Sequence, residues 1–78
     1  VMSTSGNPPV PPTLGTRIAA LREKRGGMKQ QELAKNAELS VTFLSEVEND
    51  HRKPGADALL RLADALETTL DYLVKGEL

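Results

Sequence analysis

The side-chain types that most often carry out catalysis or bind metal ions are scarce in this sequence. His51 is the only histidine, and none of the 78 residues is a cysteine. A zinc site and a nucleophilic triad each need several such groups, so neither can be assembled. No histidine, lysine or glycine-rich loop is arranged around the carboxylates to make an acid–base pair or a phosphate cradle. The sequence therefore predicts a protein that is not an enzyme and that uses no metal ion or cofactor.

The charged residues are nearly balanced in number but unevenly placed along the chain. The net charge is −1, and a mildly acidic balance is not typical of a nucleic-acid-binding protein. Residues 14–25, however, carry four basic side chains and one acidic one, whereas residues 55–78 carry two basic and five acidic ones. A molecule polarised in this way can still present one positive face to a polyanion.

The length and composition predict one small soluble domain that follows a tail. Residues 1–12 hold four of the five prolines and no charged side chain, so we expect a flexible tail there and the domain over residues 13–78. No apolar run approaches the roughly 18 residues of a membrane span, and the opening residues lack the features of a signal peptide. We therefore expect no membrane association and a cytoplasmic location.

The spacing of apolar residues predicts helices only. They recur every three or four positions, and no stretch shows the period-two alternation of a strand. Thr13, Ser40 and either Thr68 or Thr69 are good helix caps, whereas Lys29 is a poor one. The predicted helices cover residues 14–25, 30–37, 41–49 and 56–66, followed by a short last helix. The fold class is therefore all-α.

The second and third predicted helices form the layout in which one helix crosses a DNA backbone and the next lies in the major groove. Ala34 falls where these two helices must approach closely. The positions at which packing sets the angle between them are apolar: Leu33, Ala37, Leu39, Leu44 and Val47. At these positions the sequence resembles the helix-turn-helix of the Cro and phage-repressor family. The resemblance implies a compact five-helix, lambda-repressor-like bundle, and it runs through LGTRIAALREKRG, QQELAKNAELSVTFLSEVEND and KPGADALLRLADALETTLDYL.

The same resemblance implies which residues of the third helix touch base edges: Val41, Thr42, Ser45 and Glu46. They lie on the first two turns after the Ser40 cap, the end that normally enters the groove. Val41 and the Thr42 methyl can pack on a thymine methyl, the hydroxyls can donate or accept, and Glu46 can accept from cytosine N4. No arginine, glutamine or asparagine stands at these positions, which excludes bidentate reading of guanine or adenine from them. An ordinary solvated polar face is the alternative.

The resemblance further implies contacts with the DNA backbone. Gln30 begins the second helix, where backbone N–H groups and a side-chain amide can hold a phosphate. Asn49, Arg52 and Lys53 follow the recognition helix and match the family's other phosphate contacts. Weaker candidates, each of which could equally be a solvated charge, are Arg17, Lys24, Arg25, Lys29 and Lys35.

Other residues of this region are expected to be structural. Arg22 and Glu48 match an ion pair of the family, and breaking such a pair costs roughly 3 to 5 kcal/mol if it is deeply buried. Glu38 and Asp50 replace glycines usual in the family's turns, so each is a candidate for a left-handed conformation that costs about 1 kcal/mol. Phe43 could contact sugar and phosphate, but we favour a role in covering the seam between the second and third helices.

The end of the chain offers more apolar surface than one short helix can bury. The residues concerned lie where the family often pairs, and they are Leu70, Tyr72, Leu73, Val74 and Leu78. One recognition helix reaches only a few base pairs, so useful specificity calls for two half-sites. We therefore predict a symmetric homodimer on an inverted repeat whose half-site centres lie about 34 Å apart.

The function that the resemblance implies is transcriptional regulation through double-stranded DNA. A phage-type repressor or a restriction-modification controller fits the small size best, acting at its own promoter by blocking it or by touching RNA polymerase. Without an effector domain, no small-molecule effector is expected. An antitoxin that also represses is an alternative within the class. The alternative from another class is a protein-interaction module with the same fold.

Overall fold

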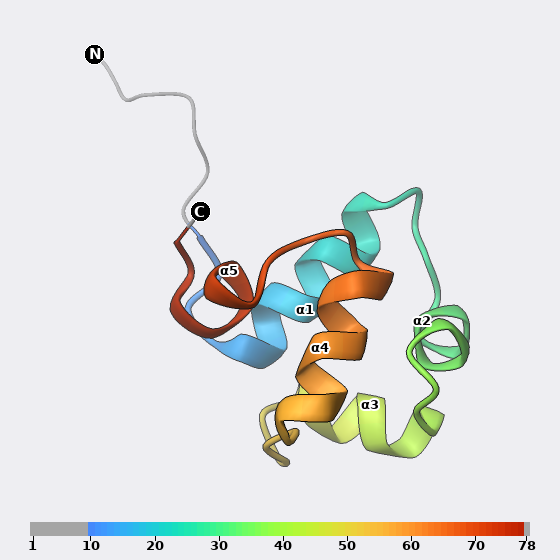
Figure 1. Cartoon of the computed structure of the whole chain (residues 1–78). Helices are drawn as coiled ribbons and strands as arrows, with labels where there is room; N and C mark the ends of the chain where they lie inside the picture. Colours follow the sequence, from blue (N-terminus) through green and yellow to red (C-terminus); the bar gives the residue numbers. More distant parts are fainter. Residues whose placement is uncertain (1–9, 78) are drawn as a thin grey trace.

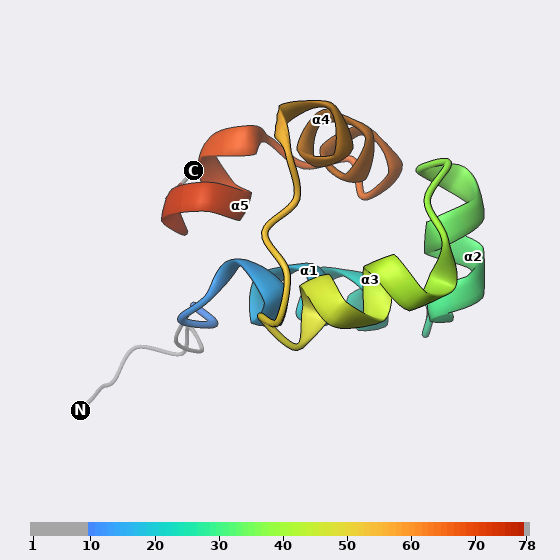
Figure 2. The same cartoon turned by 90° about the horizontal axis from the view of Figure 1, so that it is seen from below.

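The computed structural model of the protein describes residues 10–77, which form five helices and no strand. The helices are α1 (Leu14–Lys24), α2 (Gln30–Asn36), α3 (Val41–Glu48), α4 (Ala56–Ala65) and α5 (Leu70–Lys75). α1 packs against α3 and α5, α2 packs against α3 and α4, and α4 packs against α5. The five helices therefore close into a ring around one core (Figures 1 and 2). The predicted all-α, five-helix class is confirmed, and the predicted helix ends differ by one residue.

Side chains cap three of the helices at their first residues. The Thr13 hydroxyl accepts a hydrogen bond from the backbone N–H of Thr16, and the Thr16 hydroxyl accepts one from the backbone N–H of Thr13. The Ser40 hydroxyl caps α3, and the Thr69 hydroxyl caps α5. Lys29 makes no side-chain cap at the start of α2. The caps predicted from the sequence are therefore confirmed, and Thr69 is the one used in the last helix.

Three helices end in the same way, with a non-glycine residue in the left-handed region. Glu38, Asp50 and Glu67 have φ of 58°, 61° and 54° and follow α2, α3 and α4. In each case the next residue donates back to a carbonyl five positions earlier, as His51 N does to Glu46 O at 2.8 Å. This is the bonding of a Schellman motif, in which glycine is usual. The sequence identified Glu38 and Asp50 as candidates but missed Glu67.

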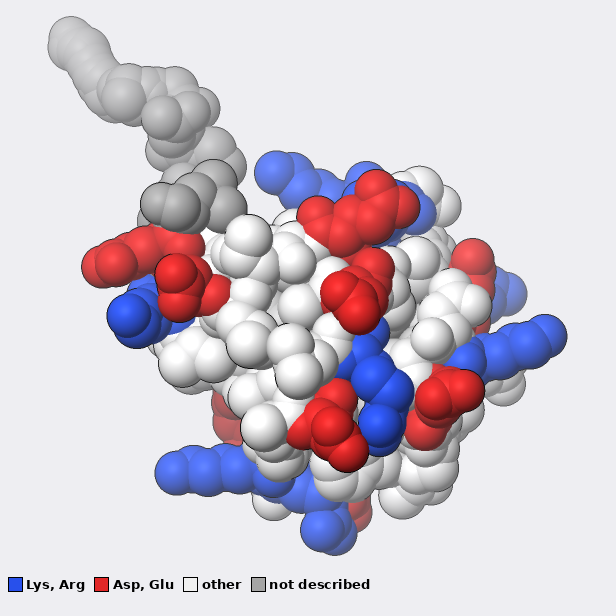
Figure 3. Space-filling view, in the orientation of Figure 1, with Lys and Arg blue, Asp and Glu red and all other residues white. Residues whose placement is uncertain are grey.

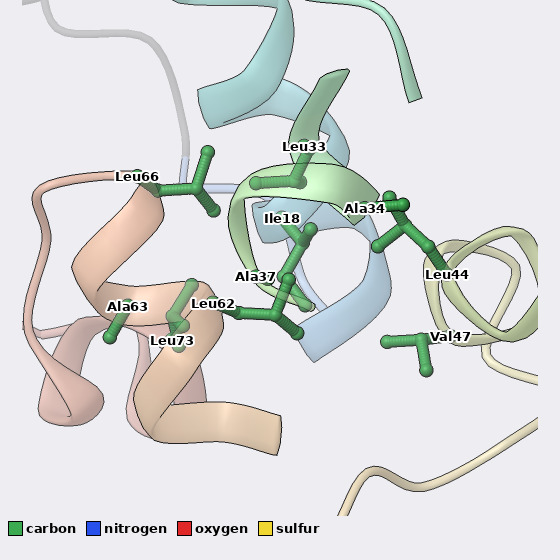
Figure 4. Packing of buried hydrophobic residues seen from close by; sticks show 10 residues of the cluster. All are labelled: Ile18, Leu33, Ala34, Ala37, Leu44, Val47, Leu62, Ala63, Leu66 and Leu73. Carbon is green, nitrogen blue, oxygen red and sulfur yellow. The ribbon is translucent and has the colours of Figure 1, made fainter. Parts of the chain in front are cut away.

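All five helices contribute side chains to the core. The largest fully buried ones include Ile18 of α1, Leu33 of α2, Leu44 of α3, Leu62 of α4 and Leu73 of α5. Figure 4 shows these side chains pointing toward one another between the helices. No helix of the described part of the chain could span a bilayer, since none combines the necessary length and apolar character.

The burial of Leu73 corrects one prediction. Its side chain has no exposed surface and belongs to the core, so its assignment to a dimer interface is wrong. The apolar face of α5 is needed inside the chain, where Leu73 packs between α1 and α4. Tyr72 is half-buried and also packs against the core. The outward apolar residues of α5 are Leu70 and Val74.

Arg17 of α1 secures the end of α5. Only 7% of this residue is exposed, and its guanidinium donates to three backbone carbonyls: Leu73 O at 2.8 Å, Val74 O at 3.1 Å and Pro11 O at 2.9 Å. The weaker assignment of Arg17 to DNA phosphate is therefore wrong, because its guanidinium is buried and bonded to carbonyls of the chain. Of the predicted tail, residues 1–9 lie outside the described residues, and Pro11 is held against the domain.

Candidate nucleic-acid interface

The recognition helix predicted from the sequence is α3, which has one buried and one outward face. Leu44 and Val47 are fully buried, whereas Val41 and Thr42 are exposed and Ser45 is partly exposed. α3 lies at the edge of the molecule, with its outward face not covered by another described segment (Figures 1 and 2). All four predicted base-reading residues thus have accessible side chains on one helix, since the Glu46 side chain is 39% exposed.

A network of buried polar groups fixes the end of α3 against α1 and α2. Arg22 forms two hydrogen bonds with the Glu48 carboxylate, from Nε at 2.7 Å and from Nη2 at 3.0 Å. Their side chains are 14% and 5% exposed, and Arg22 Nη1 also donates to Met28 O at 2.7 Å. The hydrogen bond with Glu48 raises the pKa of Arg22 above its ordinary value, against the opposing effect of burial. The predicted structural ion pair is confirmed.

Gln30 joins the same network. Its Nε2 donates to Glu48 Oε1 at 2.9 Å, which ties the first residue of α2 to the last residue of α3. An amide nitrogen has two hydrogens, so one N–H of Gln30 remains for another acceptor. The structure thus places the side chain of Gln30, the predicted phosphate contact, beside α3, in an orientation that Glu48 sets.

A second junction, not anticipated from the sequence, joins the start of α1 to the end of α3. Asp50 accepts from Gly15 N at 3.0 Å and from Thr13 Oγ1 at 2.7 Å. A β-carbon on Gly15 would lie 2.5 Å from Val47 O and 2.6 Å from Glu48 O, so only glycine fits this contact. The signal in the sequence was a glycine at the second position of a helix, where the residue is otherwise unfavourable.

Two predicted site residues, Glu46 and Arg52, meet on the outward side of α3. Arg52 Nε donates to Glu46 Oε1 at 2.7 Å, and the two side chains are 53% and 39% exposed in that order. The Arg52 guanidinium carbon lies 5.6 Å from the centre of the Phe43 ring, a cation–π distance. Phe43 itself packs against the core, as expected of a residue that covers a helix seam. No pattern in the sequence indicated the pairing with Arg52.

The remaining predicted phosphate contacts are exposed. Asn49 ends α3 and donates from Nδ2 to Ser45 O at 2.8 Å. Lys53 lies in the loop that follows and has no hydrogen bond or ion pair with a described residue. Of the weaker candidates, Arg25 is paired with Glu67 at 2.7 Å, and three others are exposed: Lys24, Lys29 and Lys35.

The charged groups are distributed unevenly over the surface. Figure 3 shows acidic side chains scattered over the face formed by α4 and α5, and basic side chains projecting at the edge beside the loop that follows α3. Within residues 10–77, no group of three or more histidine, cysteine or acidic side chains could hold a metal ion.

Two of the residues predicted to form the dimer surface, Leu70 and Val74, are exposed on α5. Leu70 and Val74 are 37% and 51% exposed, and their spacing of four places them on one face of the helix. Leu78, which we also assigned to this surface, lies outside the described residues.

The chain matches a known protein family and is similar to several known proteins. Residues 18–73 match the family described as Helix-turn-helix. The chain is 36% identical over 62 residues to the HTH-type transcriptional regulator ImmR of Bacillus subtilis, covering 80% of this chain and 48% of that protein. It is 37% identical over 65 residues to the repressor protein C2 of Salmonella phage P22, covering 83% of this chain and 30% of that protein. The chain thus spans less than half the length of these relatives.

Solved structures with the same fold include complexes. The P22 c2 repressor bound to synthetic operator 9T has a TM-score of 0.80 and 34% identity, over 86% of this chain and 100% of that one. The restriction-modification controller protein C.AhdI of Aeromonas hydrophila has a TM-score of 0.71 and 30% identity, over 77% of this chain and 89% of that one. A SinR protein in its SinI complex has a TM-score of 0.76 and 25% identity, over 81% of this chain and 61% of that one.

Proposed function

Because the chain belongs to the helix-turn-helix family, we propose that it is a sequence-specific, double-stranded-DNA-binding regulator of transcription whose recognition helix is α3. The observation that carries this proposal is the outward face of α3, which presents Val41, Thr42 and Ser45 from a helix fixed at its end by two polar junctions. The operator complex of the P22 c2 repressor, a relative with the same fold, supports it.

The base contacts follow from the chemistry of these three side chains. Val41 and the Thr42 methyl pack on a thymine methyl, and the Thr42 and Ser45 hydroxyls donate to or accept from base edges. These contacts are individually weak, because none is bidentate. A rigid helix is therefore needed to hold them in register with the bases, and the Glu48 network supplies that rigidity.

The backbone contacts lie on both flanks of α3. At 3.6 residues per turn, Glu48 lies on the flank of Val41 and Ser45, whereas Phe43 and Glu46 lie on the opposite flank. Gln30 is bound to Glu48, and Arg52 is bound to Glu46. A helix in the major groove has a phosphate backbone along each side. We infer that Gln30 meets one backbone and that Arg52, with Asn49 and Lys53, meets the other.

The working unit in this proposal is a homodimer. One copy of α3 reaches only a few base pairs, and the net charge of −1 gives a modest sequence-independent attraction to DNA. The exposed Leu70 and Val74 offer an apolar surface for a second copy. We expect Val74→Glu to lower the dimer fraction in sedimentation measurements, with Leu60→Glu on α4 as the control. An unchanged dimer fraction in Val74→Glu would contradict pairing through α5.

The proposed regulatory role is repression of the chain's own promoter, either by blocking the access of RNA polymerase or by contacting it. The proposed location is the cytoplasm. Repressors and a restriction-modification controller are among the similar proteins, which supports this choice. An antitoxin that also represses would use the same interface.

The experiment that tests the function is selection of bound fragments from random duplex DNA by the wild-type chain. We expect enrichment of an inverted repeat with half-site centres about 34 Å apart. Affinity for the enriched fragment should fall steeply between low and physiological salt, because bound phosphates release counterions. Enrichment of no sequence at any salt concentration would overturn the proposal.

The second candidate function is a protein-interaction module. It is favoured by one observation, the solved complex of a SinR protein with SinI, since SinR has this fold. Protein partners do not release a condensed counterion layer, so their binding should depend weakly on salt. The salt dependence therefore separates the two candidates.

A further inference from the structure

The outward side of α3 holds a carboxylate, Glu46, where an interface for polyanionic DNA would not be expected to have one. A lone carboxylate facing phosphates is repelled. In the structure it is not alone, because Glu46 Oε1 accepts from Arg52 Nε at 2.7 Å. The pair has no net charge, so the repulsion is cancelled within the protein.

The geometry of the pair leaves part of Arg52 available. Only its Nε is bonded to Glu46, and the structure records no hydrogen bond from Nη1 or Nη2 to any of residues 10–77. These two groups carry four N–H donors and share the positive charge. The guanidinium also lies over the Phe43 ring, with 5.6 Å between its carbon and the ring centre. Glu46 and Phe43 therefore hold the Arg52 guanidinium in place, whereas its Nη1 and Nη2 remain available to a ligand.

From this we propose that Glu46 is a positioning residue. Its carboxylate holds the Arg52 guanidinium over Phe43 so that Nη1 and Nη2 meet a phosphate oxygen of duplex DNA. An arginine already fixed in its bound orientation loses less side-chain freedom on binding. This assignment replaces the cytosine contact expected of Glu46 from the sequence, and it rests on the proposed DNA-binding function.

The test is a double-mutant cycle with the variants Glu46→Ala, Arg52→Ala and the double variant. The probes are the fragment enriched by the wild-type chain from random duplex DNA and a scrambled duplex of the same composition. We expect Arg52→Ala to weaken binding to both duplexes about tenfold and to lower the salt slope by about 1. Glu46→Ala should weaken both about threefold to tenfold, although it removes a negative charge.

The coupling between the two residues is the decisive readout. In the Arg52→Ala background, removing Glu46 should leave affinity unchanged or strengthen it, because an unpaired carboxylate then faces the phosphates. Glu46→Gln should retain the wild-type affinity, since its amide oxygen can still accept from Arg52 Nε. Asp64→Asn, on the exposed surface of α4, controls for the change in net charge. Urea denaturation of each variant checks that folding is intact.

Two results would overturn the proposal while leaving the DNA-binding function in place. One is additivity, with Glu46→Ala having the same effect whether or not Arg52 is present. The other is a change of preference at a single base pair in Glu46→Ala that persists in both backgrounds, which would identify Glu46 as a base reader. If the wild-type chain binds no duplex even at low salt, the proposed function fails and this inference fails with it.

Discussion

Two arginine–glutamate ion pairs whose glutamates lie on α3 have the same bond length but differ in burial and in their further partners. Glu48 and Glu46 lie two residues apart in α3, and each accepts from an arginine Nε at 2.7 Å. The Arg22–Glu48 pair is largely buried and has further partners in Gln30 and Met28 O. The Arg52–Glu46 pair is exposed and leaves two nitrogens of the arginine unbonded among the described residues. The first pair holds α3 in place, and the second orients a group toward a ligand.

The difference follows from the surroundings of each pair. Removing one partner of a buried pair leaves a charge without water or a counterion, which is strongly destabilising. Removing one partner of an exposed pair leaves a charge that water solvates, so the effect on folding is small. An ion-pair distance alone therefore says little about its role.

The largest effect that this comparison predicts is the loss of stability in Arg22→Ala. It strands the Glu48 carboxylate, so we expect the free energy of unfolding to fall by about 3 to 5 kcal/mol. Urea denaturation measures it, and Lys35→Ala, which removes an exposed charge, serves as the control. Equal midpoints for Arg22→Ala and Lys35→Ala would contradict the structural role of the pair.

The pH dependence sharpens the same prediction. Because the pKa of Arg22 is raised on folding, its stabilising contribution is complete below the ordinary arginine pKa and is lost only as the pH rises through the raised value. The difference between the wild type and Arg22→Ala should therefore be constant between about pH 6 and pH 9.

The next largest effect is expected at the other junction of α3. Gly15→Ala would place a β-carbon 2.5 Å from Val47 O, so we expect a loss of about 3 kcal/mol. Replacing glycine by alanine normally stabilises a helix by about 1 kcal/mol, so even the sign is informative. Gly55→Ala is the control, because a β-carbon there meets no atom within 4 Å. Thermal unfolding that shows Gly15→Ala to be as stable as the wild type would contradict the described contact.

Smaller effects are expected at the left-handed residues. Glu38→Gly removes backbone strain and no recorded side-chain bond, so it should stabilise the chain by about 1 kcal/mol. Asp50→Gly relieves the same strain but deletes the carboxylate that binds Gly15 N and Thr13 Oγ1. We expect it to be less stable than Glu38→Gly by about 2 kcal/mol in thermal unfolding. The opposite order would show that the α1–α3 junction contributes little.

The smallest effect on folding should come from the exposed pair. Arg52→Ala and Glu46→Ala are each expected to change the free energy of unfolding by less than about 1 kcal/mol. Urea denaturation of both variants beside Arg22→Ala tests this directly. A loss in Arg52→Ala as large as that in Arg22→Ala would remove the distinction between the two pairs.

The features that could be predicted from the sequence are those that depend on local patterns of residues. Helix periodicity and the Thr13 and Ser40 caps placed the elements, because these signals act within a few residues along the chain. The Arg22–Glu48 pair was accessible only through the family resemblance, since its members are 26 positions apart.

The features that the sequence did not reveal depend on distant contacts. The periodicity indicated that one side of α5 is apolar. It could not distinguish whether Leu73 on that side packs against α1 and α4 or against a second chain. Similarly, nothing local distinguishes Arg17, whose donors are buried at the end of α5, from a solvated arginine. The Glu46–Arg52 pairing depends on how the loop after α3 folds back, which the Schellman turn at Asp50 determines.

Base reading by the outward face of α3 can be tested by comparing Thr42→Ala with Lys53→Ala on the fragment selected by the wild-type chain and on its single-base-pair variants. We expect Thr42→Ala to relax the preference at one base pair of each half-site by about 1 to 3 kcal/mol, whereas Lys53→Ala should weaken binding to every fragment equally. An unchanged set of base preferences in Thr42→Ala, with affinity intact, would contradict base reading by this face.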